Sequence, residues 1–139
     1  MKFMILVKAD KASEAGVLPD ERSLARMGEF NQELADAGVL LAGEGLQPSA
    51  KGVRVRFSGG KRTVVQGPFV PPDELVAGFW LWQTDSLQEA VEWAKRAPFY
   101  DCAEVEIRQI LEAVDFGPAF TEELREQEEE LRAQVAARK

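Results

Sequence analysis

Glu44 is the residue of this sequence whose setting best suits proton transfer. It stands between two glycines in the apolar run of residues 39–46. If this run is a strand, Leu40, Ala42 and Leu46 share the face of Glu44, because side chains alternate along a strand. A carboxylate among apolar groups can exchange protons with a bound molecule, and it can equally form an ion pair at an interface. Both interpretations stay open.

Arg108 is the natural partner for that carboxylate. It lies in the alternating segment 103–111, where Glu104 and Glu106 occupy its face. A guanidinium binds carboxylate or phosphate in a bidentate way. Arg108 therefore suits either the anionic part of a small molecule or an ion network on the face of a sheet.

Trp80 and Trp82 are further candidates for ligand contact. They project from one face of the predicted strand 78–83, whereas Phe79 and Leu81 project from the other. Because both faces of this strand must be covered, the strand is expected at the centre of a sheet. The two indoles either line a flat apolar pocket or pack in a core or a dimer interface.

A turn and a polar side chain complete the candidate site. The step Gln66-Gly67-Pro68-Phe69 favours a rigid turn that presents Gln66 and Phe69, either to a ligand or as a structural corner. Gln47 follows Glu44 by three positions and is expected to assist it. Catalysis is thus assigned to Glu44 and Arg108, and ligand binding to the two tryptophans, Gln47, Gln66 and Phe69.

Composition excludes several kinds of chemistry. The 139 residues contain no histidine, which removes Ser-His-Asp and Cys-His systems and imidazole metal sites. No metal and no cofactor are predicted. The net charge of -7 disfavours binding to nucleic acid or to an anionic membrane, and the single Cys102 cannot form an internal disulfide. The opening apolar run is too short for a signal peptide or a spanning helix, so a cytoplasmic protein is expected.

The elements that position these residues follow from periodicity and from cap residues. The pattern predicts a final helix after Thr121, which is a plausible N-cap, with a thin apolar stripe and a mostly charged surface. Before it, the predicted elements are a strand at 2–8, a helix from Pro19 to Gly38, a strand at 39–46, a hairpin at 53–65, a strand at 78–83, a helix from about 87 to 96 and a strand at 103–111.

This order contains two strand-helix-strand units around an inserted hairpin, which is the ferredoxin-like α+β plan. In that plan an antiparallel sheet carries both helices on one face. The simplest cover for its other face is the identical sheet of a second subunit, so a homodimer is expected.

Seven segments of the chain form a recognisable series: MKFMILVKAD, AGVLLAGEGLQPS, VRVRFSGGK, QGPF, GFWLWQ, EAVEWAKRAP and EVEIRQI. Together, and in this order, they are similar to the YCII-related superfamily and particularly to its DGPF-domain branch. The similarity spans residues 1–111, and residues 115–134 resemble a C-terminal extension found in one bacterial subgroup. The resemblance implies a ferredoxin-like domain at 1–111 that pairs into a dimeric α/β barrel, with a pocket near the dimer interface, and an extension at 112–139.

The chain departs from this family at three positions where chemistry is expected. Gln66 replaces the acidic first residue of the Asp-Gly-Pro-Phe motif, and Gln47 stands where related sequences often carry a histidine. The histidine and aspartate proposed for YCII-type relatives are also absent, since Ala97 precedes Pro98. The leading hypothesis is a small-molecule-binding protein with cofactor-independent lyase or isomerase activity, and the alternative is a non-catalytic ligand-binding or regulatory module.

Overall fold

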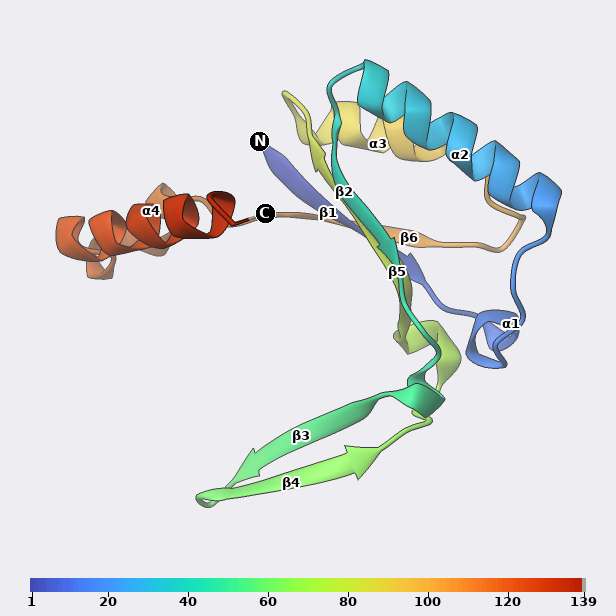
Figure 1. Cartoon of the computed structure of the whole chain (residues 1–139), viewed down its shortest axis with the longest axis horizontal. Helices are drawn as coiled ribbons and strands as arrows, with labels where there is room; N and C mark the ends of the chain where they lie inside the picture. The colour runs from blue at the N-terminus through green and yellow to red at the C-terminus, as the bar shows by residue number, and fades with distance from the viewer. Residues whose placement is uncertain (139) are drawn as a thin grey trace. The chain divides into compact units, whose positions relative to one another are not determined.

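The computed structural model describes residues 1–138 and separates the chain into two compact units, Met1–Gln109 and Ile110–Lys139 (Figure 1). The first unit contains β1 (Lys2–Lys8), α1 (Lys11–Glu14), α2 (Glu21–Asp36), β2 (Leu40–Gly45), the 3-10 turn η1 (Ser49–Lys51), β3 (Val53–Ser58), β4 (Lys61–Gln66), the 3-10 turn η2 (Pro72–Glu74), β5 (Val76–Gln83), α3 (Leu87–Lys95) and β6 (Val105–Gln109). The second contains η3 (Ala113–Ala119) and α4 (Glu122–Ala136).

Four strands form the main sheet of the first unit in the order β2-β5-β1-β6. All neighbouring pairs are antiparallel, and α2 and α3 lie on the same side of the sheet (Figure 1). Two strand-helix-strand units connected in this order make a ferredoxin-like fold, so the predicted fold class is confirmed. β5 lies at the centre of the sheet, between β2 and β1. This position was predicted because both faces of the strand are apolar in the sequence.

The core lies between the sheet and the two helices. Phe3 and Ile5 of β1 pack with Trp82 of β5 and with Phe30 and Leu34 of α2, and all five are buried. These residues follow the two-residue period of a strand and the three-to-four-residue period of a helix, so each element turns one apolar face inward.

Side-chain caps fix where the helices begin. Asp20 caps α2 by accepting a hydrogen bond from the Ser23 N–H, so the helix begins at Glu21 and not at the predicted Pro19. Ser86 caps α3 by accepting from the N–H of Glu89, as predicted. The Glu89 carboxylate accepts in turn from the N–H of Asp85, one residue before the cap.

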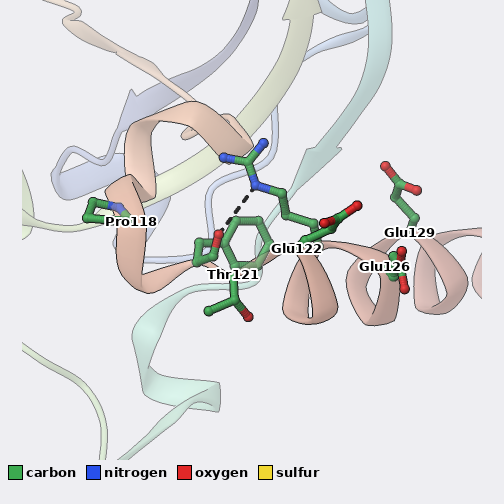
Figure 2. Close-up of a pocket in the computed structure, with 7 residues that line it drawn as sticks. Pro118, Thr121, Glu122, Glu126 and Glu129 are labelled. Atoms are coloured by element: carbon green, nitrogen blue, oxygen red, sulfur yellow. Dashed lines mark hydrogen bonds between the residues drawn. The ribbon is translucent and has the colours of Figure 1, made fainter.

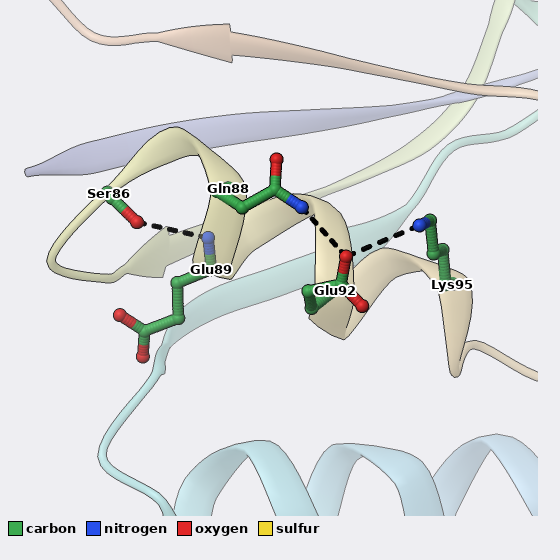
Figure 3. A network of polar contacts seen from close by, with 5 residues as sticks. All are labelled: Ser86, Gln88, Glu89, Glu92 and Lys95. Carbon is green, nitrogen blue, oxygen red and sulfur yellow. Dashed lines mark hydrogen bonds and ion pairs between the residues drawn. The ribbon is translucent and has the colours of Figure 1, made fainter.

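The exposed surface of α3 is a short network of polar side chains (Figure 3). Gln88 and Lys95 both donate to Oε1 of Glu92, at 2.8 and 3.3 Å. Because these residues are three or four positions apart, they stabilise the helix locally and leave its other face to the core.

A bulge in β2 changes which residues share a face. Leu40 pairs with Trp82 and Ala42 pairs with Leu81, so the intervening residue Leu41 is extra. Directly opposed residues of antiparallel strands share a face. Leu40 therefore lies on the helix side of the sheet, and the expectation that it shares the face of Glu44 is wrong.

The hairpin β3–β4 forms a second sheet of two strands only. Gly59 and Gly60 connect them with positive φ angles of 54° and 80°, which only glycine adopts readily. Figure 1 shows the hairpin leaving the end of the main sheet and extending on the side away from α2 and α3.

The second unit consists of a 3-10 segment and a helix. Thr121 caps α4 by accepting from the N–H of Leu124, as predicted, and Arg132 pairs with Glu128 at 2.9 Å. The apolar stripe of Leu124, Leu131 and Val135 is exposed. No helix within residues 1–138 has the length and apolar character needed to cross a membrane.

Candidate functional site

The face of the main sheet turned away from α2 and α3, called the outer face below, carries Glu44. Register places two rows of side chains across it, and four half-buried apolar residues form its centre. One row is Ala42, Leu81, Met4 and Arg108, and the other is Glu44, Phe79, Leu6 and Glu106. The outer face therefore has an apolar centre with charged side chains along both edges.

Glu44 and Arg108 lie at opposite edges of this face. β2 and β6 are the two outer strands, with β5 and β1 between them. At about 4.8 Å per strand, and with an offset of two residues along the strands, the two side chains begin about 16 Å apart. Within one chain they form no ion pair, and Arg108 instead lies 3.9 Å from the carboxylate of Glu106. This contact is the network on the sheet face that the sequence allowed for Arg108.

Gln66 and Phe69 belong to a loop that is tied to the end of β2. Gln66 is the last residue of β4 and pairs with Val53. The N–H of Phe69 donates to Oγ of Ser49 at 2.9 Å, and the guanidinium of Arg54 lies 3.9 Å from the centre of the Phe69 ring. Gln47 lies two residues before Ser49, so the structure brings Gln47, Gln66 and Phe69 into one cluster of loops.

Glu14 and Ser49 hold this cluster together, and the sequence analysis missed both. The N–H of Ser49 donates to Oε2 of Glu14 at 2.9 Å, and its hydroxyl donates to Oε1. The Ser49 oxygen also accepts from Phe69. One carboxylate and one hydroxyl thus join α1, η1 and the Gln66–Phe69 turn. No local pattern could have revealed a contact across 35 residues.

Gly67 has a backbone reason to be glycine. A Cβ added there would lie 1.7 Å from the carbonyl oxygen of Ser49, which no real contact permits. Its N–H donates to the Gly52 carbonyl at 3.0 Å. The turn therefore packs directly on the backbone of η1, which supports its reading as a rigid structural corner.

Trp80 and Trp82 lie on the opposite face of the sheet from Glu44. They are 6% and 0% exposed and pack with Phe30 in the core, and Nε1 of Trp80 donates to Oδ1 of Asn31 at 2.9 Å. Nε1 of Trp82 is buried without a partner in the described residues. In the single chain the two indoles lie in the core beneath the helices, and Glu44 lies on the far side of the sheet.

None of the seven predicted site residues lines either of two open depressions. One belongs to the second unit, where Arg125 donates to the Phe120 carbonyl at 3.4 Å beside the row Glu122, Glu126 and Glu129 (Figure 2). The other is lined by residues of α2 and by Arg96 and Pro98 after the end of α3, and Arg96 pairs with Glu33 there. Within residues 1–138, no three His, Cys, Asp or Glu side chains gather in a way that could hold a metal ion.

The chain is similar to known proteins in sequence and in structure. A model of the YCII-related domain matches residues 1–114. A protein of Rhizobium meliloti (strain 1021) described as uncharacterised is 32% identical over 76 residues, which cover 55% of this chain and 61% of that protein. A solved structure of 5-chloro-2-hydroxyhydroquinone dehydrochlorinase from Burkholderia phenoliruptrix AC1100, in complex with 2,5-dihydroxybenzoquinone, covers 83% of this chain and 99% of its own, with 16% identity and a TM-score of 0.43.

Proposed function

The chain belongs to the YCII-related family, and from this we propose that it is a cytoplasmic homodimer that binds a small organic molecule between the outer faces of its two sheets. We assign this role to residues 1–111 and treat residues 112–139 as an extension. Part of the proposal is a cofactor-independent lyase or isomerase activity that uses Glu44.

One observation carries the proposal, which is the composition of the outer face. Met4, Leu6, Phe79 and Leu81 form an apolar centre that no helix of the first unit covers. Apolar surface of this extent is normally covered by a second layer of structure. A second copy with the same face supplies that layer, and a pocket between two such faces has apolar walls with a few charged groups at its edges, as small-molecule sites usually have.

The two charged edges assign the chemical roles. In a dimer whose two-fold axis runs along the strands, β6 of one copy lies over β2 of the other, so the edge that carries Arg108 and Glu106 faces the edge that carries Glu44. Glu44 then accepts a proton from a carbon of the ligand. In an isomerase it returns this proton to another carbon of the ligand. In a lyase the ligand expels a leaving group with its bonding electrons from the neighbouring carbon, and Glu44 releases the proton to the leaving group or to water. Arg108 binds the anionic oxygen that forms on the ligand. We assign to Gln47, three residues after Glu44, the role of orienting the Glu44 carboxylate.

A non-catalytic ligand-binding or regulatory module is the second candidate. The polar groups of the loop cluster are already engaged with each other, since the Glu14 carboxylate accepts twice from Ser49 and the Ser49 hydroxyl accepts from Phe69. The chain also has no histidine and carries Gln66 in place of an acid. Both facts favour binding without turnover.

The test is native mass spectrometry followed by a thermal-shift screen of small aromatic acids, lactones and polyketide-like compounds. We expect a dimer and a saturable rise in Tm with at least one compound. Glu44→Gln should abolish turnover of that compound while binding is kept, and Glu29→Gln, at an exposed position of α2 away from the outer face, is the matched control. Binding without turnover in the wild type would favour the regulatory module, and a monomer would overturn the proposal.

A further inference from the structure

The β3–β4 hairpin is the part of the first unit with the least cover. Its register places Val53, Val55 and Phe57 on one face together with Val64 of the opposite strand. All four are exposed, from 48% for Val55 to 70% for Phe57. A two-stranded sheet is marginally stable in water when it packs against nothing. An exposed apolar face on such a hairpin therefore indicates a surface that another molecule covers.

The hairpin also concentrates positive charge in an acidic protein. From residue 46 to residue 72 the sequence contains five basic residues and no acidic one, whereas the rest of the chain contains twelve basic and all 24 acidic residues. The five are Lys51, Arg54, Arg56, Lys61 and Arg62. Outside the hairpin region, a second copy of this chain is therefore strongly acidic. It attracts the basic hairpin over a long range.

The direction of the hairpin fits the same partner. It extends on the side of the sheet away from α2 and α3, which is the side of the outer face (Figure 1). A copy that approaches the outer face therefore meets the hairpin as well.

We propose that the β3–β4 hairpin is an arm that reaches across the dimer interface, packs its Val53–Val55–Phe57–Val64 face on the second copy and places its basic residues beside acidic groups of that copy. The inference rests on the proposed dimer and adds to it a second contact region outside the outer face. The cation of Arg62 over the Phe57 ring, 4.5 Å from its centre, keeps positive charge at the tip of the apolar face.

Zero-length carbodiimide crosslinking tests this with the full chain. Equal amounts of ordinary and nitrogen-15-labelled protein are mixed, unfolded, refolded together and crosslinked, and peptides that contain Lys61 are analysed by mass spectrometry. We expect Lys61 to join carboxylates of the other copy, which gives mixed-isotope pairs. Lys61→Arg, which keeps the charge and removes the amine, should abolish these pairs. Crosslinks of Lys61 that join residues of one copy only would overturn the arm, while a dimer mass in the same sample would leave the proposed function standing.

A pair of variants tests which face of the hairpin is used. Val55→Asp and Thr63→Asp add the same charge to neighbouring cross-strand positions on opposite faces. We expect Val55→Asp to weaken self-association about tenfold more than Thr63→Asp, measured by sedimentation, because only the first places a charge in an apolar contact. Equal effects would overturn the proposal. A DNA duplex that binds the hairpin without changing self-association would assign the arm to nucleic acid and overturn it as well.

Discussion

The carboxylate of Glu14 accepts two hydrogen bonds from Ser49, one from the backbone N–H at 2.9 Å and one from the hydroxyl. Ser49 in turn binds the next loop, because its hydroxyl oxygen accepts a hydrogen bond from the N–H of Phe69. A chain of three groups thus connects the end of α1 to the turn Gln66-Gly67-Pro68-Phe69. This turn is held by a carboxylate on another element, since it contains no acidic residue of its own.

Ser49→Ala should destabilise the fold by about 1–3 kcal/mol, because it leaves a half-buried carboxylate oxygen and the Phe69 N–H without their partner. The free energy of unfolding in urea measures this. Ser58→Ala, at the exposed end of β3, is the matched control and should change stability by less than about 0.5 kcal/mol. Equal losses in the two variants would show that the Glu14–Ser49 contact contributes nothing.

Gly67→Ala should lower the free energy of unfolding by about 1–3 kcal/mol or more. The Cβ of the alanine would overlap the Ser49 carbonyl, and the backbone cannot move aside as a side chain can. Gly52→Ala is a stringent control, since a Cβ at Gly52 meets the same carbonyl oxygen at an ordinary 3.5 Å. Comparing the urea midpoints separates the clash from the general effect of replacing glycine. A Gly67→Ala variant as stable as Gly52→Ala would contradict the packing of the turn on η1.

Asp20→Ser should flatten the acid side of the stability profile. The Ser23 backbone N–H, followed by the Ser23 side chain, lowers the pKa of Asp20 below its ordinary value of 3.8. A lowered folded-state pKa means that the unfolded chain takes up the proton first as the pH falls. The contribution of Asp20 is thus complete above 3.8 and is lost as the pH falls through the lower, folded-state pKa.

Serine still caps a helix but does not titrate in this range, so it separates capping from charge. The measurement is Tm against pH for both proteins, from about pH 6 to about pH 2, which spans the ordinary range of Asp pKa values. The Tm of the wild type should exceed the Tm of the variant near neutral pH, and this difference should disappear only at the acid end of the range. Parallel profiles throughout would show that Asp20 does not contribute through its ionisation.

The order of elements in the first unit could be predicted from the sequence because local patterns determine it. Short apolar runs in residues 2–8 and 78–83, and the Ser86–Glu89 spacing before α3, each require only near neighbours. The central place of β5 also followed, since both faces of its sequence are apolar. Such patterns act over a few residues, and so they predict the elements better than the contacts between them.

The candidate site could be predicted only in part, because it depends on register and on distant contacts. The bulge at Leu41 is hidden in a continuously apolar run, so the side of the sheet that Leu40 faces could not be read from alternation. Glu44 and Arg108 are each on the outer face, but strand order separates them within one chain. The Glu14–Ser49 contact spans 35 residues and has no sequence signature.

Gly43→Ala should disturb the core on the far side of the sheet from Glu44. A Cβ at this position would lie 2.6 Å from Cδ1 and 3.1 Å from Nε1 of Trp80. The indole has little freedom to move, because it is 6% exposed and donates to Asn31. We therefore expect the free energy of unfolding to fall by about 1–3 kcal/mol. We also expect a shift in tryptophan emission, because the hydrogen bond from Trp80 to Asn31 breaks.

Gly45→Ala, two residues along the same strand, is the control, since nothing lies within 4 Å of a Cβ built there. Both variants replace a strand glycine, so any difference between them reports the contact with Trp80. If Gly43→Ala keeps the wild-type emission and unfolds at the same urea concentration as Gly45→Ala, the core accommodates the methyl group. That result would show that Trp80 does not require glycine at position 43.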